Sequence, residues 1–280
     1  MNKRGENYQF EMSSPITAEK SCSRLSTHLT YGTISHRAVF QEATKKRDQI
    51  KHTNKNFAKS INSFLSRLHW RSHFIQKLED QPSIEHTSFI PVYDQIREKD
   101  EEKLEAWIEG KTGVHFIDAC MIYLRNYGWI NFRMRAMLAS FASYNLWLDW
   151  RYFAPRLAAL FTDFEPGIHY SQIQMQSGTT GINTIRMYNP YKQAMDQDPL
   201  GKFIKSQIPE VKNFPPAFFH NPPKKSLNVN LFDNEFQKEI INVKETAQYA
   251  RKKIFDIRKS QEHKILAKNV YLKHGSRGRS

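Results

Sequence analysis

The stretch GVHFIDACMIYLRNYGWINFRMRAMLASFASYNLWLDWR, residues 113–151, decides the fold of this chain. Its apolar residues recur at helical spacing, and small and aromatic residues fill many of the positions between them. The same run carries polar side chains that are costly to bury unless a charged or strongly polar group faces them. These are Asn131, Arg133, Arg135, Asp149 and Arg151. The combination predicts helices that line a polar pocket rather than a plain apolar core.

The composition is that of a globular protein from a reducing compartment. Its 280 residues, 39% of them hydrophobic, can bury a sizeable core in one large domain or two small ones. No stretch approaches the ~20 apolar residues of a membrane helix, and residues 1–15 lack the apolar segment of a secretory signal. Cys22 and Cys120 are the only cysteines, which excludes a disulfide framework and a cysteine-based metal site. We expect a cytoplasmic protein with no membrane partner and no bound metal.

The charge of the chain points to a polyanion. The formal net charge is +14, and a soluble protein this basic commonly meets nucleic acid. Residues 251–280 hold ten Lys and Arg against Asp256 and Glu262, so more than half of the excess lies in the last thirty residues. Two interpretations stay open: a solvated basic tail, and an arm that binds nucleic acid.

Nearly every periodic segment has helical spacing and no strand-like alternation is sustained, so the predicted fold class is all-α. Helices are expected over 57–78, 103–109, 114–124, 132–147 and 236–257, with Gly110 and Gly128 as helix stops and Asn131 as an N-cap. Long loops are expected at 80–99, 163–197 and 209–230. The expected organisation is an extended segment (1–22), a helical domain (23–230), a helix packed on that domain (231–258) and a basic tail (259–280).

Two short motifs could hold a ligand. Ser23, Arg24 and Ser26 in CSRLSTHLTYGTIS (22–35) could bond a pyrophosphate, although taken alone the motif is more often a helix N-cap. In SRLHWRSHF (66–74), Trp70 and Arg71 project away from the apolar stripe and could stack on a flat ligand. The competing interpretation of the second motif is an arginine that merely covers a surface tryptophan.

Residues 113–151 and four motifs in order along residues 22–211, among them the Trp70-Arg71 pair of residues 66–74, resemble the FAD-binding domain of the photolyase/cryptochrome family. Residues 113–151 match its core at Gly113, Asp118, Ala119, Met121, Leu124, Gly128, Trp129, Arg133, Arg135, Ala139, Ser140, Phe141, Asp149, Trp150 and Arg151. Residues 185–211 match at Arg186, Asn189, Pro190, Gln193, Asp198, Pro199, Gly201, Ile204, Pro209 and Glu210. The CSRLS motif and the acidic pair of DFE, residues 163–165, complete the resemblance.

The resemblance implies an all-α fold with long loops around a central FAD cavity. It implies that Ser23, Arg24, Leu25 and Ser26 hold the phosphates. It further implies FAD contacts from Tyr8, Arg71, Phe132, Arg135, Asp163, Glu165 and His169, with Asp163 paired to Arg135. In an ungapped alignment His169 lies opposite flavin N5, where a histidine could donate a proton near neutral pH; a gap would place Gly167 or Ser171 there. Catalytic roles are implied for Trp70, Glu165 and His169, and DNA contacts for Trp70, Arg133, Met175 and Arg186.

The departures from the family pattern matter as much. Of its relay of three tryptophans only Trp150 remains, because the other two positions read Ile173 and Arg97. Arg67 replaces a glutamate near the lesion pocket, and Phe132, Ala136 and Met175 replace an asparagine, a methionine and a tryptophan. The family's N-terminal antenna domain has no counterpart, since Met1 falls just before the flavin domain begins, so a separate antenna or signalling protein is a possible partner.

The implied function is blue-light-driven electron transfer from FAD to pyrimidine dimers in DNA, single-stranded DNA included. In that reaction a lesion is flipped into the pocket and stacks on Trp70. The alternative is a blue-light or redox sensor without repair activity, which the changes at Arg67, Phe132, Ala136 and Met175 favour. The basic charge and Trp70 favour repair.

Overall fold

The computed structural model describes residues 4–221 and 238–275, and within them the all-α prediction is confirmed. These residues contain no strand, only one isolated bridge between Glu98 and Leu148. The helices of the first half are α1 (Tyr8–Glu11), α2 (Pro15–Ser21), α3 (Ser26–Thr30), α4 (His36–Ile50), α5 (Lys55–Asp80), η1 (Pro82–Glu85), η2 (Pro91–Gln95), α6 (Glu101–Glu109) and α7 (His115–Tyr127). Those of the second half are α8 (Phe132–Ser140), η3 (Phe141–Asn145), α9 (Trp150–Ala158), α10 (Pro166–Ser177), α11 (Pro190–Gln197), α12 (Lys202–Gln207), η4 (Pro209–Val211), α13 (Ala217–His220), α14 (Val243–Lys259) and α15 (Gln261–His274).

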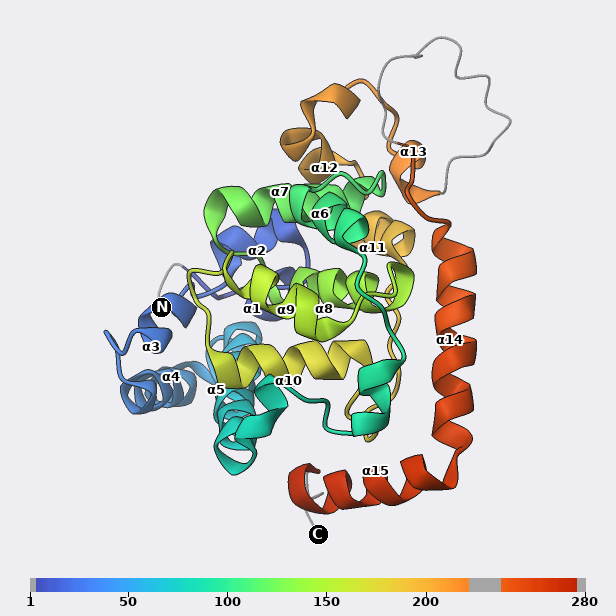
Figure 1. Ribbon diagram of the computed structural model, residues 1–280. Helices are drawn as coiled ribbons and strands as arrows, with labels where there is room; N and C mark the ends of the chain where they lie inside the picture. The colour runs from blue at the N-terminus through green and yellow to red at the C-terminus, as the bar shows by residue number, and fades with distance from the viewer. Residues whose placement is uncertain (1–3, 222–237, 276–280) are drawn as a thin grey trace.

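The stretch that decides the fold forms the centre of the molecule (Figure 1). Helices α7, α8 and α9 are the largest contributors to the main core, which also takes side chains from α6, α10 and α12. The predicted helix stops are confirmed, because Gly110 and Gly128 end α6 and α7 with φ of 72° and 64°. A side chain at Gly128 would place its Cβ 2.4 Å from the Thr162 methyl carbon, so this turn needs glycine for space as well as for φ.

The helix expected over 132–147 is shorter and differently capped. Helix α8 ends at Ser140 and continues as the π-helical turn η3. The Asn131 side chain does not cap α8; its amide nitrogen donates to the carbonyls of Met12 (3.0 Å) and Ser13 (2.8 Å). Asn131 therefore occupies the predicted N-cap position of α8, but its side chain makes no capping hydrogen bond and anchors the N-terminal segment instead.

Two expectations about irregular segments were also wrong. The loop expected over 163–197 contains α10 and α11, and most of α10 is buried. Residues 1–22 are not extended where the structure describes them, because α1 and α2 fold there. Ser14 caps α2 by accepting a hydrogen bond from the Ile16 amide (3.3 Å), and Pro15 occupies the first helical position.

Helix α5 is the long support for this centre. It packs against α10 and α4, and the approach to α10 is close enough that a Cβ on Gly167 would lie 2.7 Å from the Ile75 Cα. Its buried side includes Phe57, Ile61, Leu65 and Leu68, as the apolar stripe predicts. The opposite side of α5 is therefore available for polar and aromatic groups.

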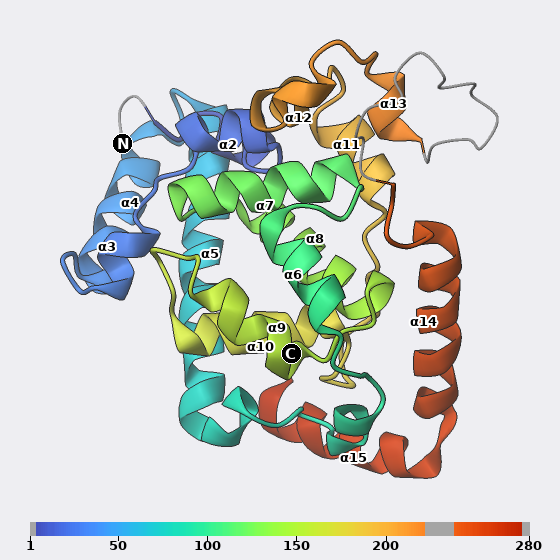
Figure 2. The ribbon, with the colours of Figure 1, turned by 45° about the horizontal axis from the view of Figure 1, so that its top comes forward.

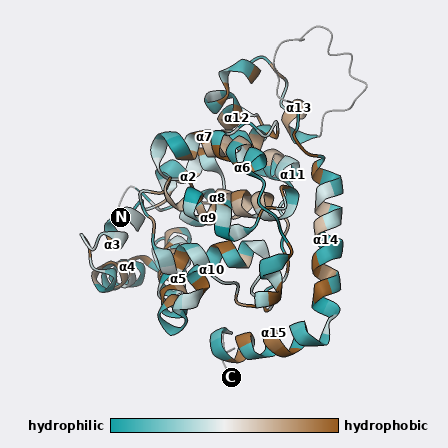
Figure 3. Cartoon of the chain, viewed as in Figure 1, coloured by the Kyte–Doolittle hydropathy of each residue, from teal (hydrophilic) through white to brown (hydrophobic). Residues whose placement is uncertain are grey.

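The C-terminal residues form two helices that run along one edge of the molecule and then across its base (Figure 2). Teal and brown segments alternate along both helices (Figure 3). Helix α15 packs on the body: the Tyr93 hydroxyl and His263 Nε2 are 2.9 Å apart, and His274 Nε2 lies 2.9 Å from Gln81 Oε1. The prediction of a basic tail over 259–280 was therefore wrong up to His274. The predicted boundary at 230/231 and residues 276–280 lie outside the described residues.

Within residues 4–221 and 238–275 no helix is both long and apolar enough to cross a membrane. The same residues contain no cluster of three or more His, Cys, Asp or Glu side chains placed to hold a metal ion.

Candidate functional site

The most distinctive polar feature is an ion pair between α8 and the turn before α10. Arg135 Nη1 and Nη2 donate to Asp163 Oδ1 and Oδ2, both at 2.9 Å, in a bidentate arrangement. Burial alone would raise the pKa of Asp163, but the charge and hydrogen bonds of Arg135 and a hydrogen bond from Ser26 outweigh it, so the pKa is lowered. Asp163 is therefore ionised, and the predicted Arg135–Asp163 pair is confirmed.

A second ion pair lies beside the first. Arg71 Nη2 of α5 donates to Glu165 Oε2 at 3.0 Å and to the Leu29 carbonyl at 3.3 Å. Both side chains are largely buried. Asp163 and Glu165 thus direct their carboxylates to arginines from two different helices, α8 and α5.

Residues 23–30 adjoin both acidic residues. Ser26 contributes to the hydrogen bonding of Asp163, and the Thr30 hydroxyl donates to the Asp163 carbonyl at 3.4 Å. Arg24 has a positive φ of 60°, unusual for a residue with a side chain. Its guanidinium lies 4.0 Å from the ring centroid of Trp129, which fixes it by a cation–π contact. The backbone strain at Arg24 lies within the motif that sequence analysis assigned to phosphate binding.

The Trp70 ring lies on the exposed side of α5, with 45% of the residue accessible. Its stacking partner is Arg67, whose guanidinium carbon is 4.5 Å from the ring centroid, whereas Arg71 is engaged with Glu165. Arg67 also hydrogen-bonds Tyr8 of α1. The site therefore joins Tyr8, Arg67 and Trp70 in a second group, one turn of α5 away from the ion pairs.

The structure does not support His169 as a proton donor near neutral pH. The ring is buried among Phe161, Phe164 and Tyr170, and its Nε2–H donates to the Ala154 carbonyl at 2.9 Å. Burial lowers the pKa of His169 to about 4, so the ring is neutral at pH 7. Its donor already has a backbone partner on α9.

The residues predicted to contact DNA are dispersed. Arg133 Nη1 is 3.5 Å from Gln193 Oε1 of α11, Arg186 is exposed in the loop before α11, and Met175 is half-buried in α10. In the part of the chain that the structure describes, no hydrogen bond, ion pair or ring contact joins these three to one another or to Trp70. Phe132, at the start of α8, is 46% exposed.

The polar side chains of residues 113–151 do not line one pocket, contrary to the first expectation. Asp149 caps α9 and pairs with Arg151 (2.6 Å between Oδ2 and Nη2), so these two satisfy each other. Asn131 anchors the N-terminal segment, and Arg133 faces α11. Arg135 is the member of the set that pairs with Asp163.

The three positions that correspond to the family's tryptophan relay, Trp150, Arg97 and Ile173, each have a structural role. Trp150 is fully buried, with its Nε1–H donating to the Ser88 hydroxyl at 2.9 Å and its ring 6.3 Å from that of Tyr170. Arg97 is buried and donates to the Ser143 and Ser177 carbonyls at 3.0 and 2.9 Å. Ile173 is a core residue.

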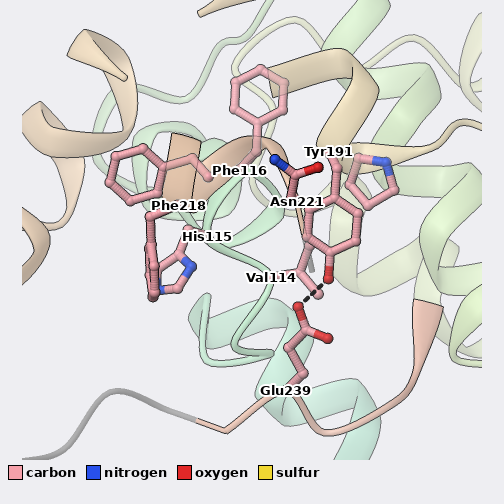
Figure 4. Close-up of a pocket in the computed structure, with 9 residues that line it drawn as sticks. Val114, His115, Phe116, Tyr191, Phe218, Asn221 and Glu239 are labelled. Atoms are coloured by element: carbon pink, nitrogen blue, oxygen red, sulfur yellow. Dashed lines mark hydrogen bonds between the residues drawn. The ribbon is translucent and has the colours of Figure 1, made fainter. Parts of the chain in front are cut away.

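Two concave regions lie apart from the ion pairs. A groove of about 490 Å³ runs between Leu25, Ile34 and the outer side of α4, with Lys45 and Lys46 on its rim. A smaller cavity of about 10 Å³ lies between α7, α11 and α13, and there the Tyr191 hydroxyl donates to Glu239 (Figure 4). The smaller cavity has room for one water molecule at most.

Sequence reasoning missed two side chains that shape the site. Phe161 lies 4.2 Å from the guanidinium carbon of Arg135, and Trp129 stacks on Arg24. Both contacts cross between elements and leave no local signal. The contact of Arg67 with Trp70, spaced i, i+3 on α5, agrees with the competing interpretation of an arginine that covers a surface tryptophan.

Comparison with known proteins agrees with this geometry. Residues 64–263 match the family described as the FAD binding domain of DNA photolyase. The deoxyribodipyrimidine photo-lyase of Escherichia coli is 30% identical over 222 residues, which are 77% of this chain and 46% of that protein. That of Buchnera aphidicola is 32% identical over 241 residues, 84% of this chain and 48% of that protein. The chain thus spans less than half the length of these relatives.

Solved structures give the same result for the fold. An archaeal photolyase from Sulfolobus tokodaii with two FAD molecules superposes with a TM-score of 0.72 at 29% identity, over 88% of this chain and 52% of that one. A Synechocystis cryptochrome superposes with a TM-score of 0.79 at 22% identity, over 90% and 52%, and supports the fold alone. The matched family, its relatives and this fold agree, so the chain belongs to the FAD-binding domain family of DNA photolyases.

Proposed function

We propose that this chain binds FAD against the two ion pairs and uses blue light to drive electron transfer to pyrimidine dimers in DNA. The observation that carries the proposal is the convergence of four distant segments, residues 26–30, 71, 135 and 163–165, through direct hydrogen bonds. The exposed Trp70, one residue before Arg71, adds a ring on which a flat ligand can stack.

The side chains present fit the chemistry of FAD. The Ser23 and Ser26 hydroxyls and the Arg24 guanidinium suit a diphosphate, with Leu25 between them. Arg71, Arg135, Asp163 and Glu165 suit the polar edge of the ring and the ribityl chain. Tyr8 and Phe132 supply aromatic surface. Bound FAD supplies the electron that dimer cleavage requires, and the protein binds, orients and shields it.

Each proposed catalytic residue has a separate role. Trp70 offers an exposed ring on which a flipped base can stack. Glu165 is held by Arg71 and fixes the polar edge of the ligand. His169, on α10, has a positioning role: its neutral ring packs against Phe164 and donates to the Ala154 carbonyl of α9. Arg133, Met175 and Arg186 are proposed to meet the flanking strand, with Arg133 and Arg186 at phosphates.

The cofactor assignment has a direct test. We expect FAD to co-purify with the protein, and Arg24→Ala to weaken binding by about 10- to 100-fold through loss of a charge-assisted contact worth about 1.5–3 kcal/mol. Riboflavin, which lacks the diphosphate, is the matched ligand, and Arg24→Ala should leave its affinity unchanged. Equal losses for FAD and riboflavin would show that Arg24 does not hold the phosphates.

The reaction is tested on dimer-containing oligonucleotides, single-stranded and duplex, under blue light and in the dark. We expect light-dependent repair that falls in Trp70→Ala while the flavin content stays unchanged. Phe10→Ala, which removes another exposed ring, is the matched control. Absence of repair by a flavin-loaded protein would exclude the lyase activity and leave the cofactor assignment standing.

A second candidate function is a blue-light or redox sensor without repair. The observation that favours it is Arg67, whose guanidinium covers one face of Trp70 where a base would stack. Arg67→Glu separates the two candidates: it should raise lesion affinity if the chain is a repair enzyme and leave the photochemistry of a sensor unchanged.

DNA is the proposed partner under the first function, and an antenna or signalling protein is a further proposed partner. A cytoplasmic location is likewise a proposal, tested by fractionation of the source cells.

A further inference from the structure

Helix α14 carries a segregated basic face at the edge of the molecule opposite α3 and α4 (Figures 1 and 2). Its buried side consists of Val243, Ala250 and Ile254. With about 100° between successive residues, one outward sector collects Lys244, Arg251, Lys252, Phe255 and Lys259. We name this sector the α14 stripe, and all five of its residues are exposed.

The acidic residues of α14 lie off the stripe. Glu245 and Asp256 fall on the neighbouring flank with Tyr249, whose ring lies edge-on against Trp147 at 5.3 Å. Among residues 4–221 and 238–275, no ion pair involves Lys244, Arg251, Lys252 or Lys259. The four cations are therefore uncompensated, and they follow the helix for about 22 Å at 1.5 Å per residue.

An aromatic ring interrupts the cations. Phe255 is 57% exposed, and Lys259 Nζ lies 4.5 Å from its ring centroid. An exposed phenylalanine contributes nothing to solubility, and the inward side of α14 already supplies its packing. A flat apolar ring between phosphate-binding cations is the arrangement on which unpaired bases stack.

We propose that the α14 stripe binds single-stranded nucleic acid, with Lys244, Arg251, Lys252 and Lys259 at phosphates and Phe255 under a base. Duplex fits less well, because its paired bases do not present their faces to a convex helix. An acidic polypeptide would neutralise the cations but would leave Phe255 unpaired. The surface is separate from the ion pairs of the candidate site and does not require flavin chemistry.

The first experiment measures binding of fluorescent oligothymidine and of a hairpin duplex by anisotropy over a range of salt. The triple variant Arg251→Gln, Lys252→Gln, Lys259→Gln should lose at least about tenfold in affinity for oligothymidine. Its slope of log affinity against log salt should become shallower by about 2, since each phosphate contact on a single strand contributes about 0.7. The matched control is Lys51→Gln, Lys202→Gln, Lys212→Gln, which removes three other exposed lysines and should change both values little.

The second experiment isolates the base contact. Phe255→Ser should weaken oligothymidine binding about fivefold or more, since stacking of one base is worth about 1–3 kcal/mol, and should leave the salt slope and the duplex affinity unchanged. Phe10→Ser is the matched control. Far-UV circular dichroism and flavin absorbance confirm that each variant is folded.

Four results would overturn the proposal. Equal losses of oligothymidine affinity in the two triple variants would show that only the net positive charge of the protein matters. An unchanged oligothymidine affinity in Phe255→Ser, or a duplex affinity equal to that for oligothymidine, would remove the single-strand assignment. Competition by polyglutamate as strong as that by oligothymidine would assign the α14 stripe to an acidic polypeptide. None of these results depends on whether the flavin site repairs dimers.

Discussion

At the scale of single residues, the Arg135–Asp163 pair is the bidentate ion pair of the site, and its carboxylate is buried. Asp163→Asn removes the carboxylate that pairs with Arg135. The Arg135 side chain is 25% exposed. We expect a loss of about 2–3 kcal/mol in the free energy of unfolding, below the ~3–5 kcal/mol of a fully buried pair because water reaches the guanidinium. Urea denaturation at pH 7 measures it.

The matched control is Asp196→Asn, which breaks a surface pair with Lys192. That change should cost about 0–1 kcal/mol. Similar losses in the two variants would show that Asp163 is solvated and that the pair does not organise the site.

His169 gives a pH-dependent prediction. Its pKa is about 4 in the folded protein against 6.5 for a free histidine. Between pH 4 and 6.5 the His169 ring is therefore protonated in the unfolded chain but neutral in the folded protein. The contribution of His169 to the free energy of unfolding is thus complete above pH 6.5 and is lost as the pH falls toward 4. His115 and His274 have pKa values of about 4 as well, so the whole profile is steep.

We expect His169→Gln to reduce the slope of unfolding free energy against pH in this range by up to about 1.4 kcal/mol per pH unit, the value of one proton. Urea midpoints at a series of pH values measure the slope. His86→Gln, at an exposed ring, is the control. An unchanged slope in His169→Gln would mean that the ring is protonated in the folded state.

Contacts between residues far apart in the sequence explain why the site could be predicted only in part. The Arg135–Asp163 pair joins positions 28 residues apart and was accessible only through the family resemblance. The neutral state of His169 depends on the Ala154 carbonyl and three aromatic neighbours, none of which sequence spacing reveals. The resemblance thus pointed to His169 but gave no information about its surroundings.

At the scale of elements, predictability depended on whether a helix has a solvated face. Helix α6 follows the expected pattern, because its polar face meets water and Gly110 ends it. Helix α10 was missed because it is buried on most sides, so Ser171, Gln174 and Ser177 stand where an amphipathic helix has apolar residues. These polar groups are satisfied by partners from other elements, as when Gln174 Oε1 accepts from the Phe89 amide at 2.8 Å.

Helix α15 makes the correction of the C-terminal region testable. Leu266 is half-buried against the cluster around Tyr93, whereas Leu272 is exposed. We expect Leu266→Ala to cost about 1.5–3 kcal/mol of unfolding free energy and Leu272→Ala less than about 0.5 kcal/mol. Thermal and urea denaturation measure the stability of the two variants. Small losses in both would support the original prediction of a solvated tail.

At the scale of the whole molecule, the candidate site and the C-terminal helices belong to one packed body. The site is built from residues 26–30, 71, 135 and 163–165, so a ligand held there links α3, α5, α8 and the turn before α10. Helix α14 in turn packs on η3, which continues α8. Stabilisation of the site should therefore reach α14 through a continuous set of packed elements.

This connection predicts how FAD changes global stability. At a free FAD concentration of about 100 times the dissociation constant, the free energy of unfolding should rise by about 2.7 kcal/mol. Amides that exchange only through global unfolding, including those of the buried side of α14 around Ala250 and Ile254, should gain the same protection as those of α8. Hydrogen exchange with and without FAD measures both. Protection that rises in α8 but not in α14 would show that the C-terminal helices unfold as a separate unit, so that nucleic acid on the α14 stripe could not sense whether the flavin site is filled.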